Sequence, residues 1–116
     1  MPFVNITSNV TRANVDTSAT IAAVTKTVAA VLDRPAPHVV VQVELDLLMS
    51  QQESQAPVAF VHVRSIGRID DERNPITVAA LTETVAEQLN VPPARVNIYL
   101  EDISAKNWAN SGKIVG

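Results

Sequence analysis

Two stretches of the chain repeat the same order of apolar and polar positions. Apolar residues alternate with polar ones over residues 3–8, recur every three or four positions over about 17–32, and alternate again over 39–45. Alternation with β-branched residues predicts a half-buried strand, and the wider spacing predicts an amphipathic helix. The same patterns follow at residues 60–65, 75–89 and 96–102. We therefore expect two strand–helix–strand units.

The two units are also related residue by residue. Phe3-Val4-Asn5-Ile6-Thr7-Ser8 returns as Phe60-Val61-His62-Val63-Arg64-Ser65, and an offset of 57 positions matches residues 3–45 with 60–102 without a gap. Such repetition indicates two copies of one supersecondary unit, and strands joined by a helical crossover run parallel. We expect a single domain over residues 1–116 of the α/β (α+β) class. Its tandem β-α-β repeat should form a four-stranded sheet with two helices on one face.

The helix ends carry local signals. A residue within Asp16–Ser18 can cap the first helix, whereas Asn74 is expected to cap the second, with Pro75 in its first turn. Pro35 and Pro92 should end the two helices, because proline disfavours helix at the preceding residue. The apolar stripe of the first helix is expected to contain Ile21, Val24, Val28, Val31 and Leu32.

The sheet face opposite the helices is mixed in character. Polar residues share it with apolar ones, namely Phe3, Val40, Val58, Phe60 and Tyr99. A monomer would leave this apolar surface exposed to water. We predict that this face and the strand edges contact other subunits.

Composition excludes several classes of function. The net charge is −3, and the lysines and arginines are scattered, which argues against nucleic-acid binding. Without cysteine there is no thiol nucleophile or disulfide, and His38 and His62, interpreted as surface or interface histidines, lack a metal-site pattern. We expect neither metal nor cofactor. No apolar run could span a bilayer and no signal peptide is recognisable, so a cytoplasmic protein without a membrane partner is expected.

Two residues that the repeat does not explain could do chemistry. Removal of Met1 would leave the secondary amine of Pro2, and burial or a nearby cation would lower the pKa of such an amine toward the range of a general base. Arg34 stands between helix and strand where the other unit has Val91, and its guanidinium suits a carboxylate. The structural alternatives are a tolerated second residue and a cation at a helix C-terminus.

Several strings in one order make the whole chain resemble the macrophage migration inhibitory factor family of the tautomerase superfamily. Beyond the repeat, Pro2 and Ser65-Ile66-Gly67, these are Asn9-Val10 with Arg12-Ala13, Arg34-Pro35, Leu48-Met49, Pro93-Ala94-Arg95-Val96 and the Trp-bearing tail from Asp102 to Gly116. The resemblance implies a homotrimer with active sites between subunits. It also implies cofactor-free keto–enol tautomerisation of arylpyruvates such as phenylpyruvate.

The resemblance assigns roles to individual residues. Pro2 would act as general base or acid, and Arg34, in the position of the family's lysine, would bind the substrate carboxylate. Ile66 would line the pocket. Further substrate-binding positions implied by the resemblance are Ser65, Asn97, Tyr99, Trp108 and Val115.

The chain departs from the family at the expected aromatic walls. The family's Tyr-x-Asn appears as Asn97-Ile98-Tyr99, with the two residue types exchanged. Where relatives show Trp-Gly-Trp-Asn-Gly and then Phe, this chain has Trp108-Ala109-Asn110-Ser111-Gly112 and then Val115. We expect a more open or more polar pocket, whose substrate need not be aromatic.

Three hypotheses follow. The first is a tautomerase of a 2-keto or 2-enol acid of the phenylpyruvate type. The second is a weakly or non-catalytic cytokine-like interaction protein, for which secretion by a non-classical route is the alternative to a cytoplasmic location. The third is a hydratase, dehalogenase or decarboxylase of the superfamily, which would need additional arginines from among Arg64, Arg68 and Arg73.

Overall fold

The computed structural model describes residues 1–116 and contains both strand–helix–strand units. The first unit comprises β1 (Pro2–Ser8), α1 (Thr17–Val31) and β2 (Val40–Glu44), and the second comprises β3 (Ala59–Ser65), α2 (Asn74–Leu89) and β4 (Val96–Asp102). A tail hairpin of β5 (Ala109–Asn110) and β6 (Lys113–Ile114) follows. Neither α-helix has the length and hydropathy needed to cross a membrane.

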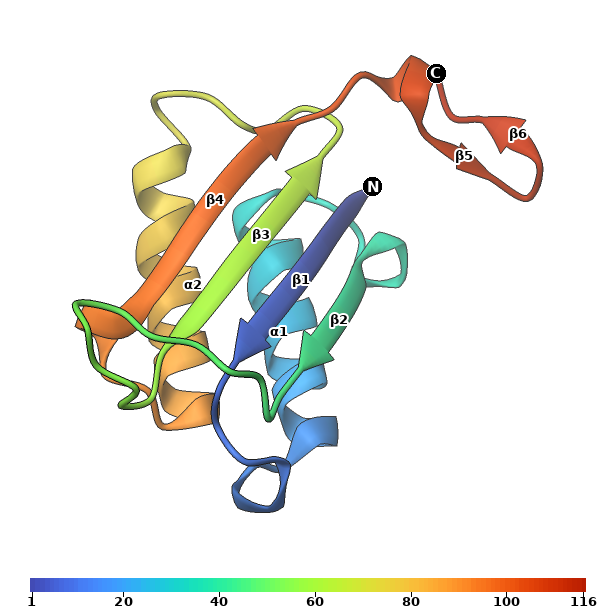
Figure 1. Ribbon diagram of the computed structural model, residues 1–116. Coiled ribbons are helices and arrows are strands. Elements are labelled where there is room, and N and C mark those ends of the chain that lie inside the picture. Colours follow the sequence, from blue (N-terminus) through green and yellow to red (C-terminus); the bar gives the residue numbers. More distant parts are fainter.

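The four long strands form one mixed sheet in the order β2-β1-β3-β4. β1 and β2 are parallel, as are β3 and β4, while β1 and β3 are antiparallel. Both helices pack behind one face of this sheet (Figure 1). The arrangement confirms the predicted fold.

The two units are related by an approximate two-fold axis through the centre of the molecule. Asn5 pairs with His62 between β1 and β3, and the hydroxyls of Thr27 and Thr84 lie 2.7 Å apart between α1 and α2. Both pairs join residues 57 positions apart. Repeat-equivalent residues therefore meet each other, as a two-fold relation between the units requires.

The core lies between the sheet and the helices, but two sequence expectations about it are wrong. Ile21 is 41% exposed and is not part of the buried stripe of α1, which instead contains Thr20 beside Val24 and Val28. Val58 is buried rather than on the open face of the sheet. Its N–H donates to Asn9 Oδ1 at 2.9 Å, which holds it inward ahead of β3.

The start of α1 agrees with the sequence, whereas the start of α2 does not. Asp16 caps α1 by accepting a hydrogen bond from the Ala19 N–H at 3.0 Å. Asn74 lies inside α2 and does not cap it. The helix has no side-chain cap, and the Asp70 carboxylate instead fixes the turn that leads into it by accepting from the N–H groups of Glu72 and Arg73 at 3.1 and 2.7 Å.

Both helices end before proline, as predicted, and they do so with the same backbone motif. Asp33 and Asn90 adopt left-handed conformations, with φ of 50° and 55°, which Asp and Asn tolerate better than most residues. The N–H groups of Arg34 and Val91 then donate to the carbonyls of Ala29 and Ala86, at 3.0 and 3.1 Å. In the first unit this turn brings Arg34 to the edge of the fold.

The open face of the sheet is mixed, as the pattern indicated. Val40, Phe60 and Tyr99 are 50%, 44% and 54% exposed. A polar pair, His62 and Glu101, lies on the same face with 2.7 Å between Nε2 and Oε1. Contact of this face with other subunits stays a prediction.

Candidate active site

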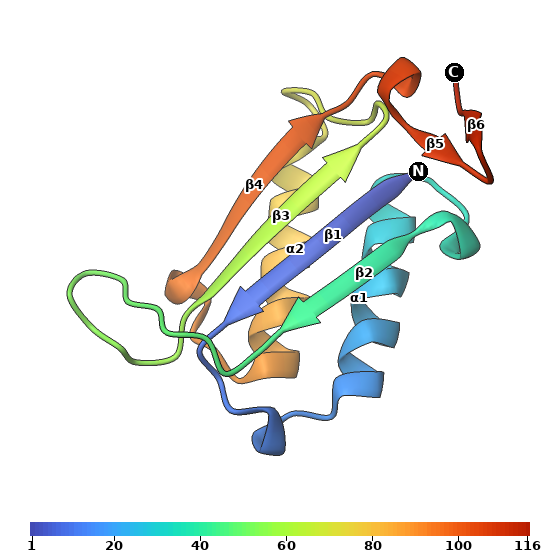
Figure 2. The same cartoon turned by 45° about the vertical axis from the view of Figure 1, so that its right-hand side comes forward.

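An open cavity of about 520 Å³ lies at the end of the sheet where β1 begins. Its walls come from the chain terminus, the α1–β2 link, the turn after β3 and the tail hairpin. The lining residues are Met1, Arg34, Pro35, His38, Ile66, Asn110 and Val115. Figure 2 shows the N-terminus close to the β5–β6 hairpin at this end of the molecule.

The amino terminus is held at the cavity by the sheet. Pro2 is the first residue of β1, is buried, and pairs with Ser65 of β3. The Met1 amine therefore lies in partly buried surroundings next to a cation. Burial lowers the pKa of this amine from its ordinary value of 8.0, and the charge of Arg34 lowers it further.

Arg34 keeps much of its hydrogen-bonding capacity unused. Its Nη2 donates to the Ile66 carbonyl at 2.9 Å, while its Nε is buried without a partner. The neighbouring carboxylate, Asp33, lies 3.9 Å from Arg68 and forms no ion pair with Arg34. The guanidinium is thus oriented by a carbonyl but is not neutralised by an acid.

The turn that orients Arg34 is fixed from two sides. The fully buried Ser65 donates from Oγ to the Gly67 carbonyl at 2.7 Å, and the Gly67 N–H donates to Asp102 Oδ1 at 3.0 Å. Gly67 has a φ of +77°, which glycine adopts without strain. Ser65 therefore shapes the turn, and its side chain does not line the cavity.

Asn97 and Tyr99 lie far from this cavity within one subunit. Pro2 is level with Ser65 and Asp102 across the sheet, whereas Asn97 is level with Phe60. Asn97 and Asp102 are five residue steps apart along the strand, which corresponds to about 17 Å. Asn97 donates to Gln51 Oε1 at 2.8 Å, and the Tyr99 ring packs on His62 with 5.0 Å between centroids.

The tail hairpin brings one predicted residue and one unexpected residue to the cavity. Val115 lines it, whereas Trp108 does not and instead accepts from the Val115 N–H through its carbonyl at 2.8 Å. Asn110 lines the cavity, with its Oδ1 accepting from Ser111 Oγ at 3.0 Å. The sequence signal that could have identified Asn110 is that it stands where the family pattern quoted above has its second Trp.

His38 was also not identified from the sequence. It ends the short 3₁₀ turn η2 (Ala36–His38), four residues after Arg34, and it lines the cavity. Its ring forms no hydrogen bond or ion pair within the chain. The spacing from Arg34 was visible in the sequence, but a 3₁₀ turn after Pro35 was needed to bring both residues to one cavity.

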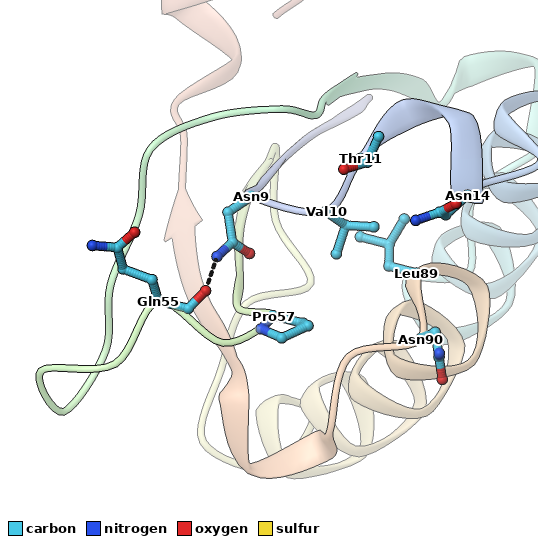
Figure 3. A pocket seen from close by; sticks show the side chains of 8 residues that line it. All are labelled: Asn9, Val10, Thr11, Asn14, Gln55, Pro57, Leu89 and Asn90. Carbon is cyan, nitrogen blue, oxygen red and sulfur yellow. Dashed lines mark hydrogen bonds between the residues drawn. The ribbon is translucent and has the colours of Figure 1, made fainter.

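A second cavity, of about 330 Å³, lies at the opposite end of the sheet and contains none of the candidate residues (Figure 3). Asn9, one of its lining residues, uses both ends of its side-chain amide in hydrogen bonds. Its Nδ2 donates to the carbonyls of Gln55 and Ala56 at 2.9 and 3.2 Å, and its Oδ1 accepts from Val58. No charged residue lines this cavity, so it offers no acid–base group.

Known proteins with a similar sequence or fold show the family to which this chain belongs. The family model described as macrophage migration inhibitory factor matches residues 1–116. The chain is 32% identical over 112 residues to macrophage migration inhibitory factor of Xenopus laevis, covering 97% of this chain and 96% of that protein. A solved homologue from Prochlorococcus marinus shares the fold, with a TM-score of 0.92 and 24% identity over 98% of this chain and 99% of that one. The structure of macrophage migration inhibitory factor from Toxoplasma gondii has a TM-score of 0.85 and 30% identity, over 96% and 97% of the two chains. The chain thus belongs to the macrophage migration inhibitory factor family.

Proposed function

We propose that this protein is a cofactor-free keto–enol tautomerase of a 2-keto or 2-enol acid. The observation that carries the proposal is that the amino terminus and Arg34 share one open cavity, where burial and Arg34 lower the pKa of the Met1 amine. Membership of a family with tautomerase and cytokine roles supports it.

Pro2 is the proposed general base and acid. Removal of Met1 would place a secondary amine at the start of β1, where Pro2 is already buried. We expect the burial and the cation that lower the pKa of the Met1 amine to act on the Pro2 amine as well. An amine with a lowered pKa is more often neutral near neutral pH and can accept a proton. It would take a proton from the carbon next to the keto group and return it to the enolate oxygen, or carry it in the reverse direction.

Arg34 is the proposed carboxylate-binding residue. Its Nη2 is tied to the Ile66 carbonyl, so the remaining donors of the planar fork have a fixed direction. Paired donors of this kind suit a carboxylate. The same charge would stabilise the enolate that forms during proton transfer.

A homotrimer with sites between subunits is the proposed assembly. Asn97 and Tyr99 could contribute to a site only from a neighbouring subunit, because they lie far from Pro2 along the sheet. The exposed apolar side chains of Val40 and Phe60 on the open sheet face favour association.

The test is ketonisation of phenylenolpyruvate followed by ultraviolet absorbance, with intact mass confirming removal of Met1. The Pro2→Ala variant should lose at least about 100-fold in kcat/KM, within the usual contribution of a positioned general base. As a matched control, an alanine inserted between Met1 and Pro2 keeps the proline but converts its nitrogen into an amide, and it should be equally inactive.

Full activity in either variant would refute the role of Pro2. An inactive wild-type protein with a free Pro2 would instead favour the cytokine-like alternative. A partner protein recovered with the wild-type chain, and not with unfolded protein, would then support that alternative.

A further inference from the structure

Within one chain, the cavity beside the amine is lined by one cation, Arg34, and by further hydrogen-bond donors, but by no acid and no aromatic ring. Arg34, His38 and Asn110 are its polar side chains, and the other lining residues are Met1, Pro35, Ile66 and Val115. The chain as a whole carries a net charge of −3. A local concentration of uncompensated donors in an acidic protein indicates an anionic ligand.

Asn110 presents its amide in a defined orientation. Its Oδ1 accepts the Ser111 hydroxyl at 3.0 Å, which leaves the Nδ2 group, without a partner in the chain, as the free end. An Nδ2 group only donates hydrogen bonds. Asn110 therefore suits an oxygen acceptor on the ligand rather than a hydroxyl or amine donor.

His38 offers a second donor on the α1–β2 link. Its ring has no partner within the chain and lines the same cavity as Arg34 and Asn110. Arg34, by contrast, is oriented by the Ile66 carbonyl, and Ile66 directly follows Ser65, the residue that pairs with Pro2. The cavity thus has one anion-binding group near the reacting amine and two further donors in its walls.

We propose that the cavity selects a short 2-oxo dicarboxylic acid. This inference rests on the tautomerase activity proposed above. The carboxylate next to the keto group would bind Arg34, and the distal carboxylate would bind His38 and the Asn110 Nδ2. The Pro2 amine takes the proton from the carbon between the keto group and the distal carboxylate. As that C–H bond breaks, a C=C bond forms, and the enolate oxygen then receives the proton.

The test compares the enol of oxaloacetate with phenylenolpyruvate. Wild type should show the higher kcat/KM with the dicarboxylate. In His38→Leu and in Asn110→Leu, the ratio of the two kcat/KM values should fall roughly tenfold, the effect of losing one hydrogen bond to a charged group. Lys113→Gln removes a cation from the same hairpin but outside the cavity, and its ratio should equal that of wild type.

A wild-type preference for phenylenolpyruvate, or an unchanged ratio in both leucine variants, would overturn the dicarboxylate assignment while leaving the tautomerase proposal intact. Loss of Pro2 dependence with both enols would instead remove the tautomerase proposal. Calorimetric measurement of malonate binding, compared with phenylacetate binding, tests the dicarboxylate site independently of catalysis. Malonate binding weakened by His38→Leu supports a dicarboxylate site, and absence of malonate binding overturns it.

Discussion

The guanidinium of Arg34 has two properties that matter for the site: a carbonyl fixes its orientation, and no acid neutralises its charge. Its Nη2 donates to the Ile66 carbonyl, and its charge is the second cause, after burial, of the lowered pKa of the Met1 amine. Affinity for a carboxylate and basicity of the amine are therefore coupled through this side chain. A substitution that separates charge from geometry can distinguish the two effects.

Replacing Arg34 with Gln is expected to shift the acid limb of the kcat/KM profile to higher pH. Arg34 lowers the pKa of the Met1 amine because a nearby cation disfavours the protonated form, and we expect the same effect on the Pro2 amine, whose pKa should therefore rise when the cation is removed. Because the base must be neutral, activity falls as the pH drops through that pKa, and in the variant this fall begins at higher pH. The amine pKa should not return fully to its ordinary value, because burial, the larger cause of its lowering, remains in the variant. KM for a 2-keto acid should rise roughly tenfold.

The control is Arg34→Lys, which keeps the charge but loses the fork. Its acid limb should stay near that of wild type while its KM rises. An Arg34→Gln profile with an unmoved acid limb would mean that burial alone sets the basicity of the amine.

At the scale of elements, the start of α2 depends on a carboxylate four residues before Asn74. Asp70→Ala should lower the free energy of unfolding by about 1 kcal/mol, because it removes the acceptor of the Glu72 and Arg73 N–H groups. Urea unfolding at a fixed protein concentration measures the change. Asn74→Ala, which removes only the acceptor of the Asp70 N–H, should have the smaller effect. A larger loss of stability in Asn74→Ala than in Asp70→Ala would mean that Asn74 contributes more to the start of α2 than Asp70 does.

Local pattern was sufficient for the elements but not for their ends and faces. Alternation identified the four long strands, because each has one side on the core. Asn74-Pro75 and Asp70 are both good starting signals, and the choice depends on how the chain leaves the turn after β3. Ile21 and Thr20 fit the helical spacing equally well. The packing of the helix decides between them, and it buries Thr20 and leaves Ile21 exposed.

Two of the candidate site residues could be predicted from the sequence and two could not, because local pattern does not show which distant segments meet. Pro2 and Arg34 could be chosen because each has a property independent of distant contacts: removal of Met1 would make Pro2 a terminal secondary amine, and Arg34 is an exception to the repeat. His38 reaches the cavity only through the 3₁₀ turn after Pro35, and Asn110 reaches it only when the tail hairpin folds back toward the chain terminus. No local spacing encodes that return.

At the scale of the whole molecule, the repeat explains why one end of the sheet is open. The equivalent of Arg34 in the second unit is Val91, which is buried, and the equivalent of His38 is Arg95. Arg95 donates to four carbonyls of the loop at 51–57, between 2.8 and 3.2 Å. Its donors are thus used to hold a loop. The proposed base, Pro2, likewise has no counterpart in the second unit, where the equivalent position is Ala59.

The same two-layer design leaves one sheet face uncovered, and assembly should depend on it. Phe60→Glu places a charge on this face, where Phe60 is 44% exposed, so an isolated subunit should still fold while association weakens. Ile76→Glu is the matched control, since Ile76 is 66% exposed but lies on α2, away from that face. Sedimentation at micromolar concentration should show trimers for wild type and Ile76→Glu, and smaller particles for Phe60→Glu. If sites lie between subunits, tautomerase activity should fall with the trimer. A Phe60→Glu monomer with full activity would place the complete site within one chain.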